Sequence, residues 1–201
     1  MNKSSIFQTY LTMLDDLKKL NNETNIKALS DNADSFISNN INFFTKSFMI
    51  TLCAYLESYL KDISMEIINA MNLRLIIAKL PHNLVKWSIL KKKELTDLSD
   101  TELKFEQLTI KISKEELDDF ISGMPYRTEN LFKKFGIKLL DDEIYKNHKE
   151  KIISIVVKRN KILHYNDNAS DLSFADVTNN IDYVIKYIEN LDKIVVEYIE
   201  N

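Results

Sequence analysis

Residues 174–198 read FADVTNNIDYVIKYIENLDKIVVEY, and this stretch determines the fold class. Large apolar side chains recur in it at alternating steps of four and three residues: Val177, Ile181, Val184, Ile188, Leu191, Val195 and Tyr198. Such a seam packs along neighbouring helices in a bundle, whereas an independent parallel coiled coil needs more heptads. Because Ser173 and Asp176 have the spacing of an N-terminal cap, we expect this helix to begin at Ser173.

Three further segments show helical periodicity. The pattern predicts helices over residues 6–20, 41–71 and 142–164, and the second of these is expected to be covered on two faces. The polar run 21–40 is predicted to be a loop that holds a short helix around residues 33–37. Together with the last helix, these segments predict an all-α, up-and-down bundle of long helices.

The region 81–136 differs from the rest because it contains both prolines and both glycines of the chain. It shows short helical patterns, one after the capping-box spacing of Ser113 and Glu116, and one over residues 127–135 that Gly136 is expected to end. We interpret it as an insertion of short helices within a single domain that spans residues 1–201. The insertion either confers specificity or covers the core.

The composition agrees with a helical protein. Only two glycines and two prolines occur among 201 residues, whereas all-β folds need many tight turns. Hydrophobic residues make up 45% and charged residues 28% of the chain, as in folded globular domains. The length is sufficient to bury a core.

Charge and cysteine content exclude several kinds of site. The net charge of −3 gives no overall attraction to nucleic acid, so any such contact must come from a local patch. Cys53 is the single cysteine, which excludes an internal disulfide, and its apolar neighbours predict burial. The sequence shows neither a signal-peptide pattern nor a long uncharged apolar stretch, so we expect a cytoplasmic protein that does not enter a membrane.

The segment Arg159-Asn160-Lys161-Ile162-Leu163-His164 places a charge where a core residue is expected. At about 100° per residue, Arg159 falls at the centre of an apolar stripe. The stripe comprises Ile152, Ile155, Val156, Ile162 and Leu163, and a second row comprises Ile153, Val157, Asn160 and His164. One row suits the core of the protomer, and the other is a candidate contact for a second subunit. A charge in such a stripe is costly unless it is paired or lies in a cleft.

These residue types suit phosphate chemistry. The planar guanidinium of Arg159 is matched to phosphate, His164 can exchange a proton near neutral pH, and Asn160 can orient a neighbour. No glycine-rich phosphate loop is present, and three scattered histidines do not make a metal site. Arginine with histidine and no metal indicates acid–base cleavage of a phosphodiester, and RNA provides its own 2′-OH nucleophile.

The same segment resembles the R-x4-6-H signature of HEPN domains, in which a polar residue follows the arginine. Its place near the end of the penultimate long helix, before a turn and a final amphipathic helix, also matches that family. Residues 48–62, FMITLCAYLESYLKD, resemble the core helix of HEPN proteins from prokaryotic defence loci. The resemblance covers roughly residues 41–71 and 142–199.

The resemblance implies a metal-independent endoribonuclease without a cofactor. HEPN proteins typically dimerise, so that two signatures form one cleft, and cleavage leaves a 2′,3′-cyclic phosphate and a 5′-OH. Transferred to this chain, His164 is the acid–base residue, Arg159 holds the scissile phosphate, and Asn160 orients the substrate or His164. The family also implies a toxin or phage-defence effector, with an antitoxin or another defence protein as a possible partner.

Several neighbouring residues are candidates for the cleft or for RNA contact: Glu57, Lys61, Lys158, Lys161 and Tyr165. For Glu57 and Lys61 the preferred interpretation is a solvated surface pair. The run Lys91, Lys92 and Lys93 is either a phosphate contact or a solvated face. In some HEPN toxins a tyrosine two residues after the histidine is modified by an antitoxin, but here Tyr165 follows His164 directly.

Two other functions remain open from the sequence. The first is a non-catalytic HEPN-like helical module that binds a partner as an accessory or antitoxin-like subunit, which the slightly acidic charge balance favours. The second is a nucleotide-binding sensor.

Overall fold

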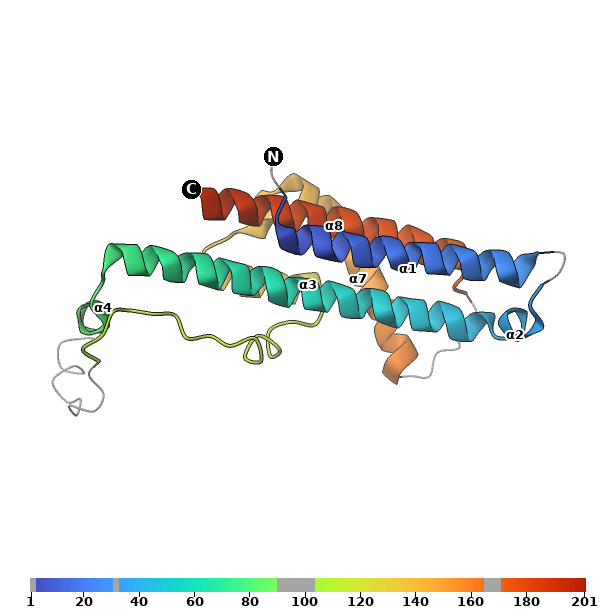
Figure 1. The fold of residues 1–201 in the computed structure, drawn as a ribbon, viewed down its shortest axis with the longest axis horizontal. Helices are drawn as coiled ribbons and strands as arrows, with labels where there is room; N and C mark the ends of the chain where they lie inside the picture. The colour runs from blue at the N-terminus through green and yellow to red at the C-terminus, as the bar shows by residue number, and fades with distance from the viewer. Residues whose placement is uncertain (1–2, 31–32, 90–103, 165–170) are drawn as a thin grey trace.

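Four long helices form the molecule in the computed structural model, which describes residues 3–30, 33–89, 104–164 and 171–201. They are α1 (Ser5–Leu29), α3 (Ile41–Ala78), α7 (Glu143–His164) and α8 (Phe174–Glu200). Helix α1 runs antiparallel to α3 and α8, and α7 packs against both α3 and α8 (Figure 1). The expected all-helical bundle is confirmed, because the described ranges hold one isolated β-bridge and no strand.

Helix α8 supplies the centre of the core. The seam predicted from its sequence is buried from Val177 to Val195, and its side chains face α1, α3 and α7. The predicted cap at Ser173 is also confirmed, since Ser173 and Asp176 form a reciprocal capping box. A hydrogen bond also joins α3 to α8, since the buried Tyr59 hydroxyl of α3 donates to the Ile188 carbonyl of α8 over 3.0 Å. Each large side chain buried in this way contributes about 1.5–3 kcal/mol.

The prediction of a loop directly after residue 20 was wrong, because α1 continues to Leu29. Its buried face extends past Leu17 through Asn21, Thr24 and Ala28 at helical spacing. Asn21 is fully buried and donates to the Phe174 carbonyl and to the Thr178 hydroxyl, each over 2.9 Å. Contacts with α8 therefore extend a helix that polar composition alone did not predict. The expected short helix is present as α2 (Ser35–Ser38).

Helix α3 also runs further than predicted, to Ala78. It ends where Lys79 adopts a left-handed conformation, with φ 52°, just before the Leu80–Pro81 step. Proline disfavours helical geometry in the residue before it. The extra turns pass the C-terminal end of α8, where Arg74 donates to the Ile199 carbonyl over 2.5 Å. A cation at this end of a helix is favourable because terminal carbonyls there lack helical partners.

The region 81–136 contains both helices and extended chain. Helix α4 (His82–Ile89) is followed, beyond the undescribed segment, by an extended stretch from residue 104 and by α6 (Pro125–Lys134). The short η2 (Leu139–Asp141) comes after the region and leads into α7. Gly136 ends α6 with φ +84°, as predicted. The capping box between Ser113 and Glu116 forms, yet residues 114–120 make turns and no helix. Lys91, Lys92 and Lys93 lie outside the described residues.

Replacing Asn21 by alanine tests the tertiary contact that extends α1. We expect Asn21→Ala to lower the free energy of unfolding by about 1–3 kcal/mol, because the Phe174 carbonyl and the Thr178 hydroxyl lose a buried donor. Urea unfolding measures the change. Glu23→Ala is the control, since Glu23 is exposed on the same helix. Equal stability of the two variants would contradict the role given to Asn21.

Candidate functional site

Helix α7 leaves the bundle at its C-terminal end. Its apolar stripe is buried against α3 and α8 through Ile152, Ile155, Val156 and Ile162. The second row is more exposed, with Val157 at 38%. In Figure 1 the last turns of α7 project beyond α3, away from α1 and α8. The site residues at this end therefore belong to a helix of which one face is held by the protomer and another is open.

Arg159 lies on the held face, between α7 and α3. Its Nη2 atom donates to Oε1 of Glu57 and lies 3.5 Å from the Ser122 carbonyl oxygen. The side chains of Arg159 and Glu57 are 15% and 30% exposed. The charge predicted at the centre of the apolar stripe is thus paired, as the cost of burying an isolated charge requires.

A segment from the region 81–136 closes over this ion pair. We call residues 113–123 the strap. Gly123, at its end, has φ +70°, and a Cβ atom built there would lie 3.3 Å from Cγ2 of Val156 and 3.6 Å from Oε1 of Glu57. The backbone of the strap is therefore in close contact with both α7 and α3, and glycine permits both the approach and the conformation.

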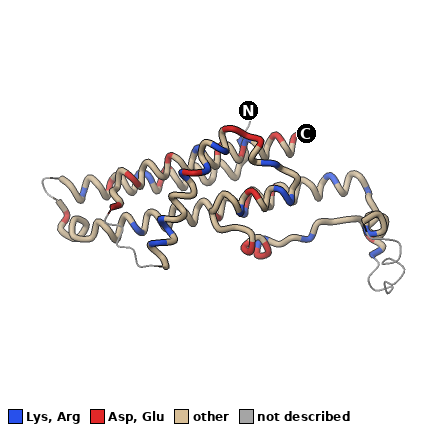
Figure 2. The backbone as a smooth tube through the Cα atoms, turned by 180° about the vertical axis from the view of Figure 1, so that it is seen from behind, with Lys and Arg blue, Asp and Glu red and all other residues tan. Residues whose placement is uncertain are grey.

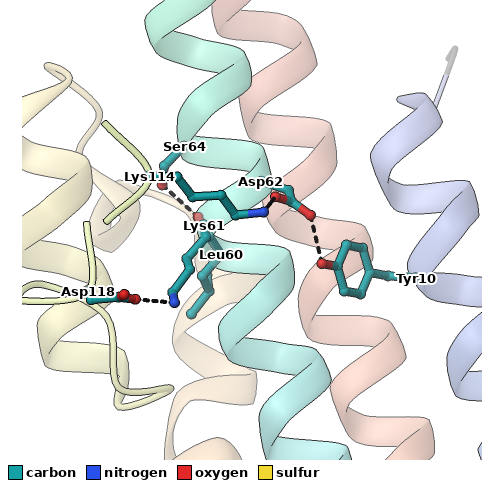
Figure 3. A network of polar contacts seen from close by, with 7 residues as sticks. All are labelled: Tyr10, Leu60, Lys61, Asp62, Ser64, Lys114 and Asp118. Atoms are coloured by element: carbon teal, nitrogen blue, oxygen red, sulfur yellow. Dashed lines mark hydrogen bonds and ion pairs between the residues drawn. The ribbon is translucent and has the colours of Figure 1, made fainter. Parts of the chain in front are cut away.

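Two further ion pairs fix the strap to α3 (Figure 3). Lys61 pairs with Asp118, and Lys114 pairs with Asp62. Asp62 also accepts a hydrogen bond from the Tyr10 hydroxyl over 2.7 Å, which links the strap to α1. Burial and the Asp62 carboxylate both raise the pKa of Tyr10, so that its hydroxyl remains a donor. The expected surface pair between Glu57 and Lys61 is thus replaced by a separate partner for each side chain.

Cys53 lies one helical turn before Glu57 and is buried, as predicted. Burial raises the pKa of its thiol to about 11, although the nearby Arg159 guanidinium opposes the rise. The thiol therefore stays protonated at neutral pH and offers no nucleophile to the site.

His164 and Asn160 do not join this cluster. His164 is exposed and Asn160 is partly exposed, and neither side chain forms a hydrogen bond with any residue that the structure describes. Five residues along a helix correspond to about 7.5 Å of rise and roughly 140° of rotation. Arg159 is directed to α3 while His164 is directed to solvent, so one protomer does not bring the two to a common point.

The other candidates have different surroundings. Lys158 forms an ion pair with Asp171 over 2.5 Å, and Lys161 is exposed. Tyr165 lies outside the described residues. Basic residues mark the projecting end of α7, whereas the strap turn is mainly acidic (Figure 2). The local positive charge of the site therefore comes from α7.

The strap is the part of the site that the sequence analysis missed. Ser122, Gly123 and Asp118 were not among the candidate residues, although Gly123 is one of only two glycines in the chain. A glycine so rare, two residues before a proline, signals a special backbone position. Nothing in the sequence indicates which side chain that position would approach.

Two kinds of feature are absent from the described ranges. No three histidine, cysteine or acidic side chains there lie close enough together to hold a metal ion. None of the helices in the same ranges combines the length and apolar character needed to cross a bilayer.

The two glycines allow a matched test of the strap contact. We expect Gly123→Ala to destabilise the fold more than Gly136→Ala. Both positions have positive φ, which costs alanine about 1–2 kcal/mol. Only at Gly123 would the added Cβ also crowd a side chain at 3.3 Å, since the nearest atom at Gly136 is 3.7 Å away. Urea unfolding of both variants measures the difference, and equal losses would show that the strap contact is loose.

Comparison with known proteins identifies the family. Searches of curated proteins and of solved structures give no match. The family model described as RiboL-PSP-HEPN matches residues 12–197, which is most of the chain and includes α3, the strap, α7 and most of α8. The chain therefore belongs to the RiboL-PSP-HEPN family of HEPN domains.

Proposed function

We propose that this protein is a metal-independent endoribonuclease that acts as a homodimer. The observation that carries the proposal is the placement of the R-x4-6-H segment of a HEPN-family chain at the projecting end of α7. There Arg159 is partly buried beside α3, and His164 is open to solvent. Reaction at a phosphodiester needs a fixed cation and an accessible acid–base group, and these two residues meet those needs.

In the proposed reaction, the 2′-oxygen of RNA attacks the adjacent phosphorus. His164 takes the proton from the 2′-OH, and the bond from phosphorus to the 5′-oxygen breaks. The leaving 5′-oxygen gains a proton from a second His164, so that the products carry a 2′,3′-cyclic phosphate and a 5′-OH. Arg159 stabilises the charge that develops on the phosphoryl oxygens, and Asn160 orients the substrate or the imidazole.

The directions of these side chains support a role for a second copy of the chain. Because Arg159 and His164 of one protomer diverge, the proposed site combines groups from two protomers. The projecting end of α7 offers the contact surface, since Val157 of the exposed row is 38% exposed and Leu163, at the end of the other stripe, is 49% exposed. Isologous dimers use the same patch twice, so this row would place two projecting α7 ends side by side.

One observation favours the alternative function. Arg159 is already neutralised by Glu57, as in a purely structural ion pair. A non-catalytic member of the family, which binds a partner as an accessory or antitoxin-like subunit, would need nothing more from this arginine. Activity measurements on variants distinguish the two functions.

We expect the purified protein to cleave RNA in the presence of EDTA, and His164→Ala to lower the rate by about 10²- to 10⁴-fold. Arg159→Ala should lower the rate by about 10²- to 10³-fold, because the charge of the transition state loses its main stabiliser. Gel analysis of total RNA and tRNA measures cleavage, and end-group analysis detects the cyclic phosphate.

His148→Ala is the matched control for this experiment, because His148 lies on the same helix and bonds to the Ile144 carbonyl. Its activity should equal that of wild type. Expression in cells gives a second measurement: a toxin or defence effector should arrest growth, and Arg159→Ala should relieve the arrest. If the RNA stayed intact after treatment with either wild type or His164→Ala, the nuclease would be rejected in favour of the binding module.

The dimer is tested separately with Val157→Glu. A charge on the exposed row should convert the dimer to monomers and abolish cleavage, while the helical content of the protomer stays unchanged. Analytical ultracentrifugation measures the mass. Ile77→Glu is the control, because Ile77 is 80% exposed at the far end of α3. A Val157→Glu protein that remains dimeric and active would place the interface elsewhere.

A further inference from the structure

The guanidinium of Arg159 contacts three neighbours within the protomer. Nη2 contacts both Oε1 of Glu57 and the Ser122 carbonyl oxygen. The guanidinium also forms a side-chain hydrogen bond with Cys53, which opposes the rise in the pKa of that thiol. The side chain is therefore fixed in direction, and its five N–H groups exceed these three partners, so that donors remain for a ligand.

Glu57 is itself fixed from two sides. Its place on α3 puts it against Arg159. The Gly123 backbone also packs against it, since a Cβ atom built on Gly123 would lie 3.6 Å from both the Cγ and the Oε1 atom of Glu57. One helical turn further along α3, the pairs Lys61–Asp118 and Lys114–Asp62 hold the strap in register. Figure 3 shows that these two pairs leave α3 on different sides, so the strap cannot slide along the helix without breaking one of them.

We infer that Glu57 is a positioning residue, which orients Arg159 for the scissile phosphate with the strap as its support. The inference rests on the proposed ribonuclease function and extends it to a residue outside the family signature. An unrestrained arginine side chain has many rotamers. Restricting it to the one that contacts the phosphate costs conformational entropy, which slows the reaction. Glu57 removes that loss before the substrate arrives, and misplacement of such a group costs up to about 10²-fold in rate.

The negative charge of Glu57 has a second effect that makes the inference testable. It offsets the positive charge of Arg159 and so weakens attraction to RNA in the ground state. Loss of the carboxylate should therefore lower KM, while the loss of positioning lowers kcat. A residue that merely stabilised the fold would change the amount of active protein and would leave KM unaltered at every level of activity.

The experiment compares kcat and KM of the dimeric protein on a defined RNA. Glu57→Ala should lower kcat by about 10- to 100-fold, with KM lower than that of wild type. Glu57→Gln retains an oxygen acceptor for Nη2 and should recover most of the lost kcat. Glu66→Ala is the matched control, because Glu66 is exposed on the same helix and has no partner among the described residues. It should behave as wild type.

A double variant separates positioning from any independent role. In an Arg159→Ala background, Glu57→Ala should cause no further loss of kcat, because the residue that it positions is gone. If Glu57→Ala does not fold, Glu57→Gln carries the test through its lower KM and partly reduced kcat. The inference would be overturned by a wild-type kcat in Glu57→Ala, or by a kcat above the wild-type value in Glu57→Gln. If activity still depended on Arg159 and His164, the proposed function would stand. Full activity without Arg159 and His164 would reject both.

Discussion

The fold depends on the need to bury α8 along most of its length. Its apolar seam is almost continuous, and no single neighbour can cover it, so α1, α3 and α7 pack around it. This arrangement brings α3 and α7 against one another beside α8, and Arg159 and Glu57 meet at that contact. The polar cluster is thus a consequence of how the core is assembled, and its geometry is as rigid as the helices that carry it.

Much of the fold could be predicted because it is encoded locally. The seam of α8, the cap at Ser173 and the stop at Gly136 each depend on residues close together in sequence. The ends of α1 and α3 were predicted wrongly because contacts between residues far apart in the sequence determine them. Asn21 is helical because α8 accepts its hydrogen bonds, and α3 is longer than predicted because residues near its end, including Arg74, contact α8.

The candidate site shows the same division. Arg159 was recognisable from its position within an apolar stripe, and the signature with its histidine could be read from six consecutive residues. Its partner could not be identified in this way, because Glu57 is 102 residues away and sits at surface-like spacing from Lys61. The strap was hidden for another reason: its ion pairs join side chains of ordinary surface type, and only the fold brings them together.

The divergence of Arg159 and His164 on one helix has a consequence for dosage under the proposed mechanism. A site assembled from two chains exists only in the dimer, and at low concentration the number of dimers rises with the square of the number of chains. A cell with few copies would then hold few complete sites, and doubling the number of chains would give about four times as many. The rotation of five residues around a helix would thus set a threshold for activity.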